Sequence, residues 1–256
     1  MMSDKLIVAW RKQNNQQWFI VGFLTREQNE GQCNYIFHYT QGVKKALQNG
    51  FSPIFGEDDS RDLSKQYFSN MLFPVFSNRL MTKSRPEYPQ YKDWLELEDE
   101  INPLIELMKS NGVRATDGLQ LFGIPKKEND KYIVDFFIHK SNLIPTENQK
   151  RLTQRSLGEK LYLSKDIQNP YDKDALIIRA ENPLEILGYA PRIYTQDFCT
   201  LLNHPKAQAK LSVKKLNPQA PLFYRVLCRF EANWIEGFVP FDSEDFRALS
   251  ATNACL

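Results

Sequence analysis

The sequence predicts an α+β protein of two domains, and three observations carry this prediction. The chain has 256 residues, a length that suits two domains of ordinary size or one large domain. Runs rich in β-branched and aromatic residues alternate with turn residues, and two segments carry helix signals. A charged run without apolar residues, KKENDK at 126–131, lies near the middle of the chain. We therefore expect one domain at 1–125 and a second domain at 131–256.

The first domain is expected to contain a small antiparallel sheet. β-Branched and aromatic residues dominate four of its runs, which is typical of strands. The strands are expected at 6–10, 18–24, 33–39 and 119–122. A meander is the simplest connection for the first three, and residues 42–66 are expected to be irregular.

Two helices are expected between the third and the fourth strand. The first should span about 90–97. The second should begin near Asn102, whose side chain can cap a helix, because Pro103 then occupies the first helical position that proline tolerates. It should end at Gly112. Apolar residues recur there at i, i+3 and i+4, as on the buried face of a helix.

The second domain is expected to be mainly β. Prolines at 170 and 183 cannot donate to a strand ladder, so they separate strands in the middle of this domain. An aromatic-rich tail, 234–246, is expected to fold back onto the same domain. Strands are expected at 132–138, 161–163, 175–178, 186–189, 210–215 and 223–230, and a short helix at 194–202.

Composition and motifs argue against several classes of protein. A formal net charge of +2 gives no global field that favours nucleic acid. The four cysteines form no CxxC pair and the three histidines lie far apart, so we expect no metal and no cofactor. There is no apolar signal region and no apolar run of membrane-spanning length, so a cytoplasmic protein without membrane contact is expected. Without a Gly-rich phosphate loop or a Gly-x-Ser-x-Gly motif, we expect no catalytic residues and no enzyme activity.

The turn at 169–174 is the strongest candidate for a binding site. It places an aromatic residue and a carboxylate, Tyr171 and Asp172, at a rigid tip, where binding residues are often found. An alternative with about even weight is that Asn169 and Asp172 only close turns through their side chains.

The surrounding segment resembles the HIRAN domain family, because fixed residues recur on both sides of two turns. These residues are Asn169, Pro170, Tyr171, Asp172, Ala175, Gly188, Tyr189, Pro191 and Arg192. The resemblance implies an OB-like β-barrel that binds DNA, preferentially single-stranded ends, and it implies no catalysis. One departure concerns the first strand, where the family usually has Gly–x–Arg–aromatic and this chain has IHKS at 138–141.

An aromatic side chain flanked by cations suits single-stranded DNA, because bases stack on the ring and phosphates meet the cations. Asp172 would repel phosphate, but it could accept a hydrogen bond from a free terminal hydroxyl. The candidate nucleic-acid-binding residues are Lys140, Lys165, Asn169, Tyr171, Asp172, Lys173 and Arg192.

The first half resembles, more loosely, the small N-terminal subdomain of HipA-type kinases. The features are the strand pair at 6–10 and 18–24, the strand at 34–39, and the segments LFPVFSNRL at 72–80 and GVRATDGLQLF at 112–122. No kinase body follows, as in the stand-alone HipS component of split systems. The resemblance implies a kinase partner and, with it, a helix-turn-helix repressor.

The apolar segment 73–76 has two interpretations, of which domain core is favoured about two to one over a partner-facing surface. Arg and Tyr are frequent at interfaces, and prolines at 86 and 89 would stiffen the adjoining loop. The candidate partner-binding residues are Phe73, Phe76, Asn78, Arg79, Arg85, Glu87 and Tyr88.

Two functions follow from these resemblances. The first is a non-catalytic, antitoxin-like regulator that binds a HipA-type kinase through 1–125 and single-stranded DNA ends through 131–256. The alternative is a DNA-end-binding adaptor, in DNA repair or phage defence, without a kinase partner.

Overall fold

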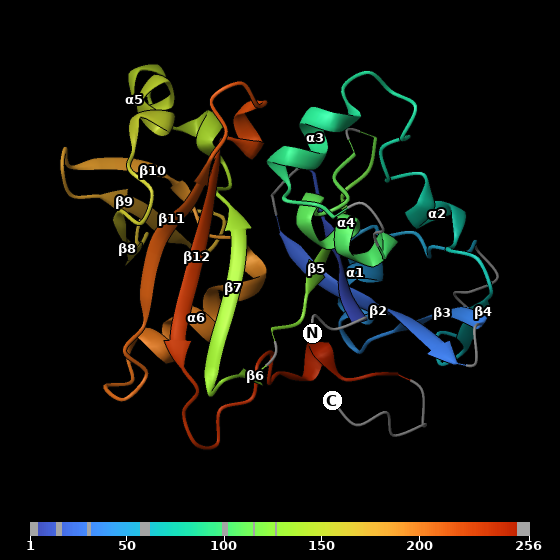
Figure 1. The fold of residues 1–256 in the computed structure, drawn as a ribbon. Coiled ribbons are helices and arrows are strands. Elements are labelled where there is room, and N and C mark those ends of the chain that lie inside the picture. Colours follow the sequence, from blue (N-terminus) through green and yellow to red (C-terminus); the bar gives the residue numbers. More distant parts are fainter. Residues whose placement is uncertain are drawn as a thin grey trace. The chain divides into compact units, whose positions relative to one another are not determined.

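The structure, a computed structural model, describes residues 5–13, 17–29, 32–56, 62–98, 102–114, 116–125 and 127–249 (Figure 1). The chain divides into two compact units. The first unit is drawn from Met1–Pro89, Leu97–Ile124 and Asp242–Leu256, and the second from Gln90–Glu96 and Pro125–Phe241. Among the described helices, none has the length and apolar character needed to cross a membrane.

The first unit is built on one antiparallel sheet. Its strands are β1 (Lys5–Arg11), β2 (Trp18–Asn29), β3 (Gln32–Tyr39), β4 (Gln66–Ser69) and β5 (Leu119–Gly123). They lie in the order β4-β3-β2-β1-β5, and each neighbouring pair is antiparallel. The predicted meander of β1, β2 and β3 is therefore confirmed. The strand predicted at 119–122 is β5, and it pairs with β1 (Figure 1).

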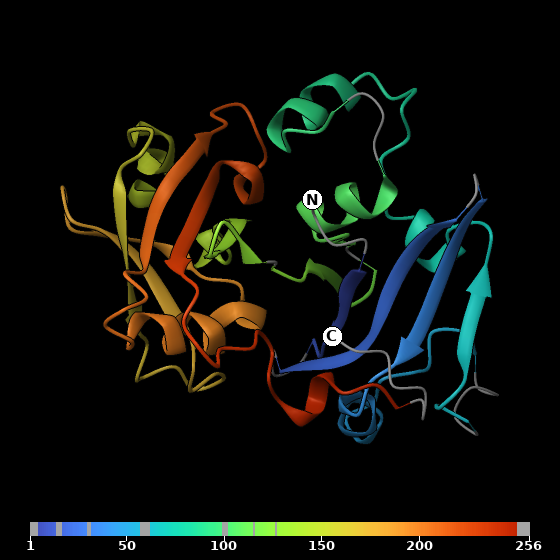
Figure 2. The ribbon, with the colours of Figure 1, turned by 60° about the horizontal axis from the view of Figure 1, so that its bottom comes forward.

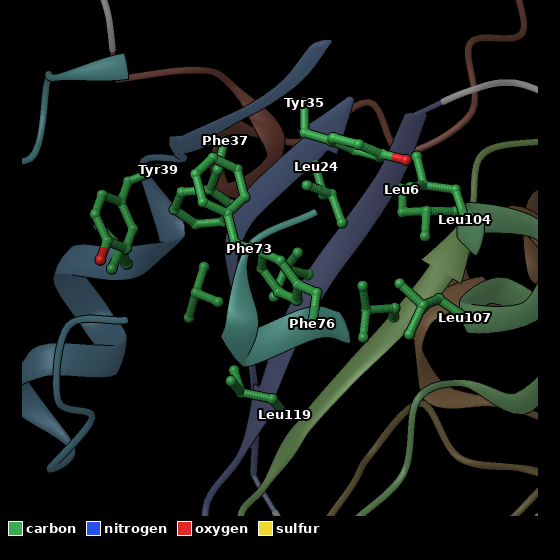
Figure 3. Packing of buried hydrophobic residues seen from close by; sticks show 14 of the residues in the cluster. Leu6, Leu24, Tyr35, Phe37, Tyr39, Phe73, Phe76, Leu104, Leu107 and Leu119 are labelled. Carbon is green, nitrogen blue, oxygen red and sulfur yellow. The ribbon is translucent and has the colours of Figure 1, made fainter. Parts of the chain in front are cut away.

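One face of this sheet carries the core of the first unit (Figure 3). Alternate residues of β3, including Phe37, point into it with Phe76 of α2 (Pro74–Ser77), and both rings are fully buried. Leu104 and Leu107 of α4 (Pro103–Ser110) pack on the same core. The Asn102 side chain caps α4 as predicted, because its Oδ1 accepts a hydrogen bond from the Leu104 N–H at 3.0 Å.

Besides α2, the first unit contains a further helix that the sequence analysis did not predict. Helix α1 (Gly42–Gln48) lies within 42–66, the stretch expected to be irregular, so that expectation was wrong in part. No side chain caps its first turn, which explains the weak sequence signal. Val43 and Ala46 are fully buried, and this packing stabilises the helix instead.

The tail of the chain completes the first unit rather than remaining with the second. Trp234 and Phe238 pack near Tyr132 in the second unit, as the sequence predicted for this tail. From Asp242 onwards, however, the chain belongs to the first unit. The Leu249 N–H donates to the Tyr39 carbonyl at 3.0 Å, and the short helix η6 (Glu244–Phe246) lies beside α1 (Figure 2). The tail at 234–246 was expected to fold back onto the second domain, and this holds only as far as Phe241.

The second unit is an antiparallel sheet of seven strands, in the order β10-β9-β8-β11-β12-β7-β6. Beyond one end of β7, His139 and Tyr189 exchange two backbone hydrogen bonds of 2.9 and 2.8 Å. This bridge joins β10 to the continuation of β7, so the sheet closes on itself. Closure is consistent with the barrel that the HIRAN resemblance implies. The strands are β6 (Lys127–Glu128), β7 (Lys131–Phe137), β8 (Lys160–Lys165), β9 (Leu176–Ala180), β10 (Glu185–Tyr189), β11 (Lys210–Leu216) and β12 (Val226–Asn233).

Helix α6 (Thr195–Leu202) covers the interior of this closed sheet. Its Phe198 is fully buried and stacks on Phe230 of β12, with ring centroids 4.0 Å apart. The remaining helical segments of the second unit are short: α3 (Tyr88–Trp94, of which the second unit holds the part from Gln90), α5 (Thr146–Arg151), η2 (Ser141–Leu143), η3 (Leu152–Gln154), η4 (Arg192–Tyr194) and η5 (Leu222–Tyr224).

The first turn of α6 contains a buried carboxylic acid, Asp197, which makes the stability of the second unit depend on pH. Asp197 accepts hydrogen bonds from the Tyr132 hydroxyl and the Phe241 N–H, both at 3.1 Å. Burial raises the pKa of Asp197 from 3.8 to about 6. Because the folded state favours the protonated acid, this contribution to stability is fully present below pH 3.8 and is lost as the pH rises through 6.

We expect Asp197→Asn to remove this pH dependence, because asparagine keeps an acceptor for the Phe241 N–H and cannot ionise. Urea unfolding of both proteins between pH 4 and 7.5 measures the effect. As the pH rises, the free energy of unfolding of the variant should increase relative to that of the wild type, by a total on the order of 3 kcal/mol. A constant difference across this range would contradict the assignment.

Candidate nucleic-acid interface

The candidate site is the loop 166–175 that connects β8 to β9. At its base, the Asp166 N–H donates to the Ala175 carbonyl at 2.9 Å. The Asn169 Oδ1 accepts from the N–H groups of Tyr171 and Asp172, each at 3.0 Å, and its Nδ2 donates to Asp166 at 3.1 Å. The turn-closing role of Asn169 is therefore confirmed, and this side chain fixes the backbone from which Tyr171 projects.

Asp172 closes a second turn and also forms an ion pair. Its Oδ1 accepts from the Asp174 N–H at 3.0 Å, and its Oδ2 lies 3.0 Å from Arg192 Nε. The Arg192 guanidinium also lies 3.4 Å from Asp174 Oδ2 and donates to Thr195 Oγ1 at 2.8 Å. Among the described residues, each carboxylate oxygen of Asp172 thus has one protein partner, and a carboxylate oxygen can accept a further hydrogen bond.

Two apolar side chains of this loop extend into solvent. Tyr171 is 60% exposed and Ile167 is 88% exposed. Exposed apolar residues this close together are more informative than a single one, because each forgoes the free energy of burial. The loop therefore offers an uncovered aromatic ring at a backbone position that is held by hydrogen bonds.

A chain of contacts connects this loop to Lys140. The Tyr189 hydroxyl donates to Asp166 Oδ2 at 2.9 Å. The Lys140 Nζ lies 5.7 Å from the centroid of the Tyr189 ring, and Lys140 has a left-handed backbone with φ of 54° directly after the closing bridge. The departure from the family pattern at 138–141 thus still places a cation beside the loop.

Lys165 and Lys173 complete the set of predicted residues. Both side chains are exposed, at the end of β8 and within the loop. All seven predicted nucleic-acid-binding residues are therefore grouped around one loop of the closed sheet.

The sequence analysis missed four contributors to this site. Asp174 and Thr195 share Arg192 with Asp172, and Asp166 holds Asn169. Asp174 lies inside the predicted turn and Thr195 lies three residues after Arg192, so their positions in the sequence were a hint. The contacts themselves are visible only in the fold. Ile167 could have been noticed as the apolar residue in a polar loop.

The predicted partner-binding residues fall into two groups. Phe73 and Phe76 are buried in the core, which confirms the favoured interpretation of that segment. Arg79 is also buried: its side chain is 1% exposed, and it forms an ion pair with Asp117 at 2.6 Å. The residues left with accessible side chains are Asn78, Arg85, Glu87 and, half-buried, Tyr88.

Among the described residues, no group of three or more His, Cys, Asp and Glu side chains could hold a metal ion. The Asp172, Asp174 and Arg192 cluster is instead an ion-pair network, which can bind charged and hydroxyl groups of a ligand.

Comparison with known proteins matches part of the chain to a family. The family model of the HIRAN domain matches residues 148–234. A crystal structure of a protein from Lactobacillus plantarum is 18% identical, covers 40% of this chain and 96% of its own chain, and has a TM-score of 0.32. The crystal structure of the HIRAN domain of human HLTF is 14% identical, covers 39% of this chain and 74% of its own, and has a TM-score of 0.31. No curated protein matches the chain. The HIRAN resemblance predicted from Asn169 to Arg192 is thus confirmed for residues 148–234.

Proposed function

We propose that the second unit binds single-stranded DNA at a strand end, through the loop 166–175 and Arg192, and that its role is binding rather than catalysis. The match to the HIRAN domain supports DNA as the ligand. The observation that carries the proposal is Tyr171, an exposed ring on a turn that the Asn169 side chain holds in place.

The chemistry of the loop suits the end of a strand. A terminal base can stack on Tyr171, and Lys165 and Lys173 can meet phosphates next to it. Asp172 can accept a hydrogen bond from a terminal hydroxyl, because each of its oxygens has a single partner in the described part of the chain. Arg192 reduces the repulsion that this carboxylate would otherwise exert on phosphate.

We expect Tyr171→Ala to weaken binding of a single-stranded oligonucleotide by about 1–3 kcal/mol, because a stacking contact is lost. Tyr171→Phe should bind as well as the wild type, since the ring remains. Leu157→Ala is the matched control, because Leu157 is another exposed apolar residue of this unit, at 69%. Fluorescence anisotropy measures the affinities. Equal losses for Tyr171→Ala and Leu157→Ala would argue against stacking at the loop.

A second candidate function is regulation of a HipA-type kinase by the first unit. Its support is the sequence resemblance of 1–125 together with the exposed polar group of Asn78, Arg85 and Glu87. Co-expression of the full chain with a HipA-type kinase from the same genome, followed by size-exclusion chromatography, tests it. Failure to co-elute would leave the DNA-end-binding adaptor as the better account.

A further inference from the structure

A second cationic surface lies on the β8–β9 hairpin, apart from the loop. Lys160, Tyr162 and Ser164 alternate along β8 with the buried Leu161, so they lie on the outer face of the sheet. Arg179 of β9 is the cross-strand partner of Tyr162. We call Lys160, Tyr162 and Arg179 the β8–β9 patch.

The two cations of the patch are held against the same ring. The Lys160 Nζ lies 4.8 Å from the Tyr162 ring centroid, and the Arg179 Cζ lies 5.0 Å from it. Arg179 Nε also donates to Ser164 Oγ at 3.2 Å. Cation–π contacts of this kind keep two positive charges close together on the outer face of the sheet, where they would otherwise repel each other.

These cations remain available for a ligand. Among the described residues, neither Lys160 nor Arg179 has an acidic partner within ion-pair distance. Glu181, which directly follows β9, accepts a hydrogen bond from the Tyr162 hydroxyl at 2.7 Å, and this contact fixes the ring. This contrasts with Arg192, whose guanidinium is shared by two carboxylates.

We propose that the β8–β9 patch binds the phosphodiester backbone of the same DNA strand whose end lies at the loop, a proposal that rests on the proposed function. The ring of Tyr162 is already covered by cations, so the patch offers charge rather than a stacking face. Tyr162 and Lys165 are three positions apart on β8, about 10 Å at the rise of a strand. This distance corresponds to about three phosphates of a stacked strand. The patch therefore meets phosphates beyond the terminal nucleotides.

The test compares two lengths of oligonucleotide. Wild type is expected to bind a 12-nucleotide thymidine oligomer more tightly than a 4-nucleotide one. The double variant Lys160→Gln/Arg179→Gln should lose about tenfold in affinity for the longer oligomer and show a shallower salt dependence, because two phosphate contacts are removed. Its affinity for the shorter oligomer should change little. Lys206→Gln, an exposed cation outside the hairpin, controls for the loss of net charge.

The possible outcomes separate this proposal from the function on which it rests. If the double variant weakens both lengths equally, or neither, the patch does not bind the backbone, while sensitivity to Tyr171→Ala would still support the loop. If wild type binds neither length, the proposed function and this inference both fail. Tyr162→Phe removes the hydroxyl contact to Glu181 but keeps the ring, and it should retain length-dependent binding. Thermal unfolding of each variant shows that the sheet is intact.

Discussion

Replacing Gly188 by alanine is expected to destabilise the second unit by about 3–5 kcal/mol, in the upper range for single substitutions. Gly188 has φ of +142°, a backbone conformation that other residues rarely adopt. A Cβ there would lie 2.5 Å from Ile138 Cγ2 and 2.6 Å from the His139 carbonyl oxygen. The second of these is a backbone atom of the bridge that closes the sheet, so the clash can be relieved only by opening the bridge.

Gly158→Ala is the matched control for this prediction. Gly158 also has positive φ, +77°, but a Cβ there would have no atom within 4 Å. Gly158→Ala should lower the free energy of unfolding by only about 1–2 kcal/mol, which is the cost of the backbone conformation alone. Urea unfolding measures both variants, and DNA binding of Gly188→Ala should be lost with the closure. Similar stability losses for the two variants would show that closure at His139 contributes little.

Arg79→Met is expected to destabilise the first unit by about 3–5 kcal/mol, because it removes a buried guanidinium and its ion pair and leaves buried carbonyls without donors. The guanidinium donates to the carbonyls of Val75 and Gly112 at 2.9 and 2.8 Å, and to Asp117 at 2.6 Å. Arg79→Lys should recover only part of this stability, since an ammonium group cannot reproduce the planar arrangement of donors.

Lys45→Ala provides the comparison for Arg79→Met. Lys45 pairs with Asp245 at 2.6 Å, but its side chain is 62% exposed, so its loss should cost no more than about 1 kcal/mol. Chemical denaturation of the two variants gives the ratio of the effects. If Arg79→Met were as mild as Lys45→Ala, the Arg79 guanidinium would not organise this unit.

Local patterns predicted most of the strands and the α4 cap, because both depend on neighbouring residues, whereas the short strands β4 and β6 were not predicted. The cap needs only Asn102 and Pro103, and the meander needs short turns between strongly apolar runs. Helix α1 escaped prediction because tertiary packing, rather than a capping residue, stabilises it. The charged run 126–131 was a plausible boundary, but Lys126 lies outside the described residues, and the ranges 1–125 and 131–256 stay predictions.

Contacts between distant parts of the chain could not be predicted from the sequence. The Asn-Arg-Leu triplet at 78–80 gave no sign that Arg79 reaches carbonyls 33 and 40 residues away. The return of Leu249 to Tyr39 likewise spans almost the whole chain. For the loop, the turn role of Asn169 and the exposure of Tyr171 were predictable, whereas the ion pair between Asp172 and Arg192 required the fold.

The most direct test of end binding by this loop is the affinity of the wild type for one single-stranded oligonucleotide with a free or a phosphorylated 3′ end. The free 3′-hydroxyl should bind several-fold more tightly, because Asp172 can accept its hydrogen bond and repels a terminal phosphate. In Asp172→Asn, which keeps the acceptor for the Asp174 N–H, this preference should shrink or reverse, since Arg192 is then released towards phosphate. Equal wild-type affinity for the two ends would contradict end recognition and reduce Asp172 to a turn residue.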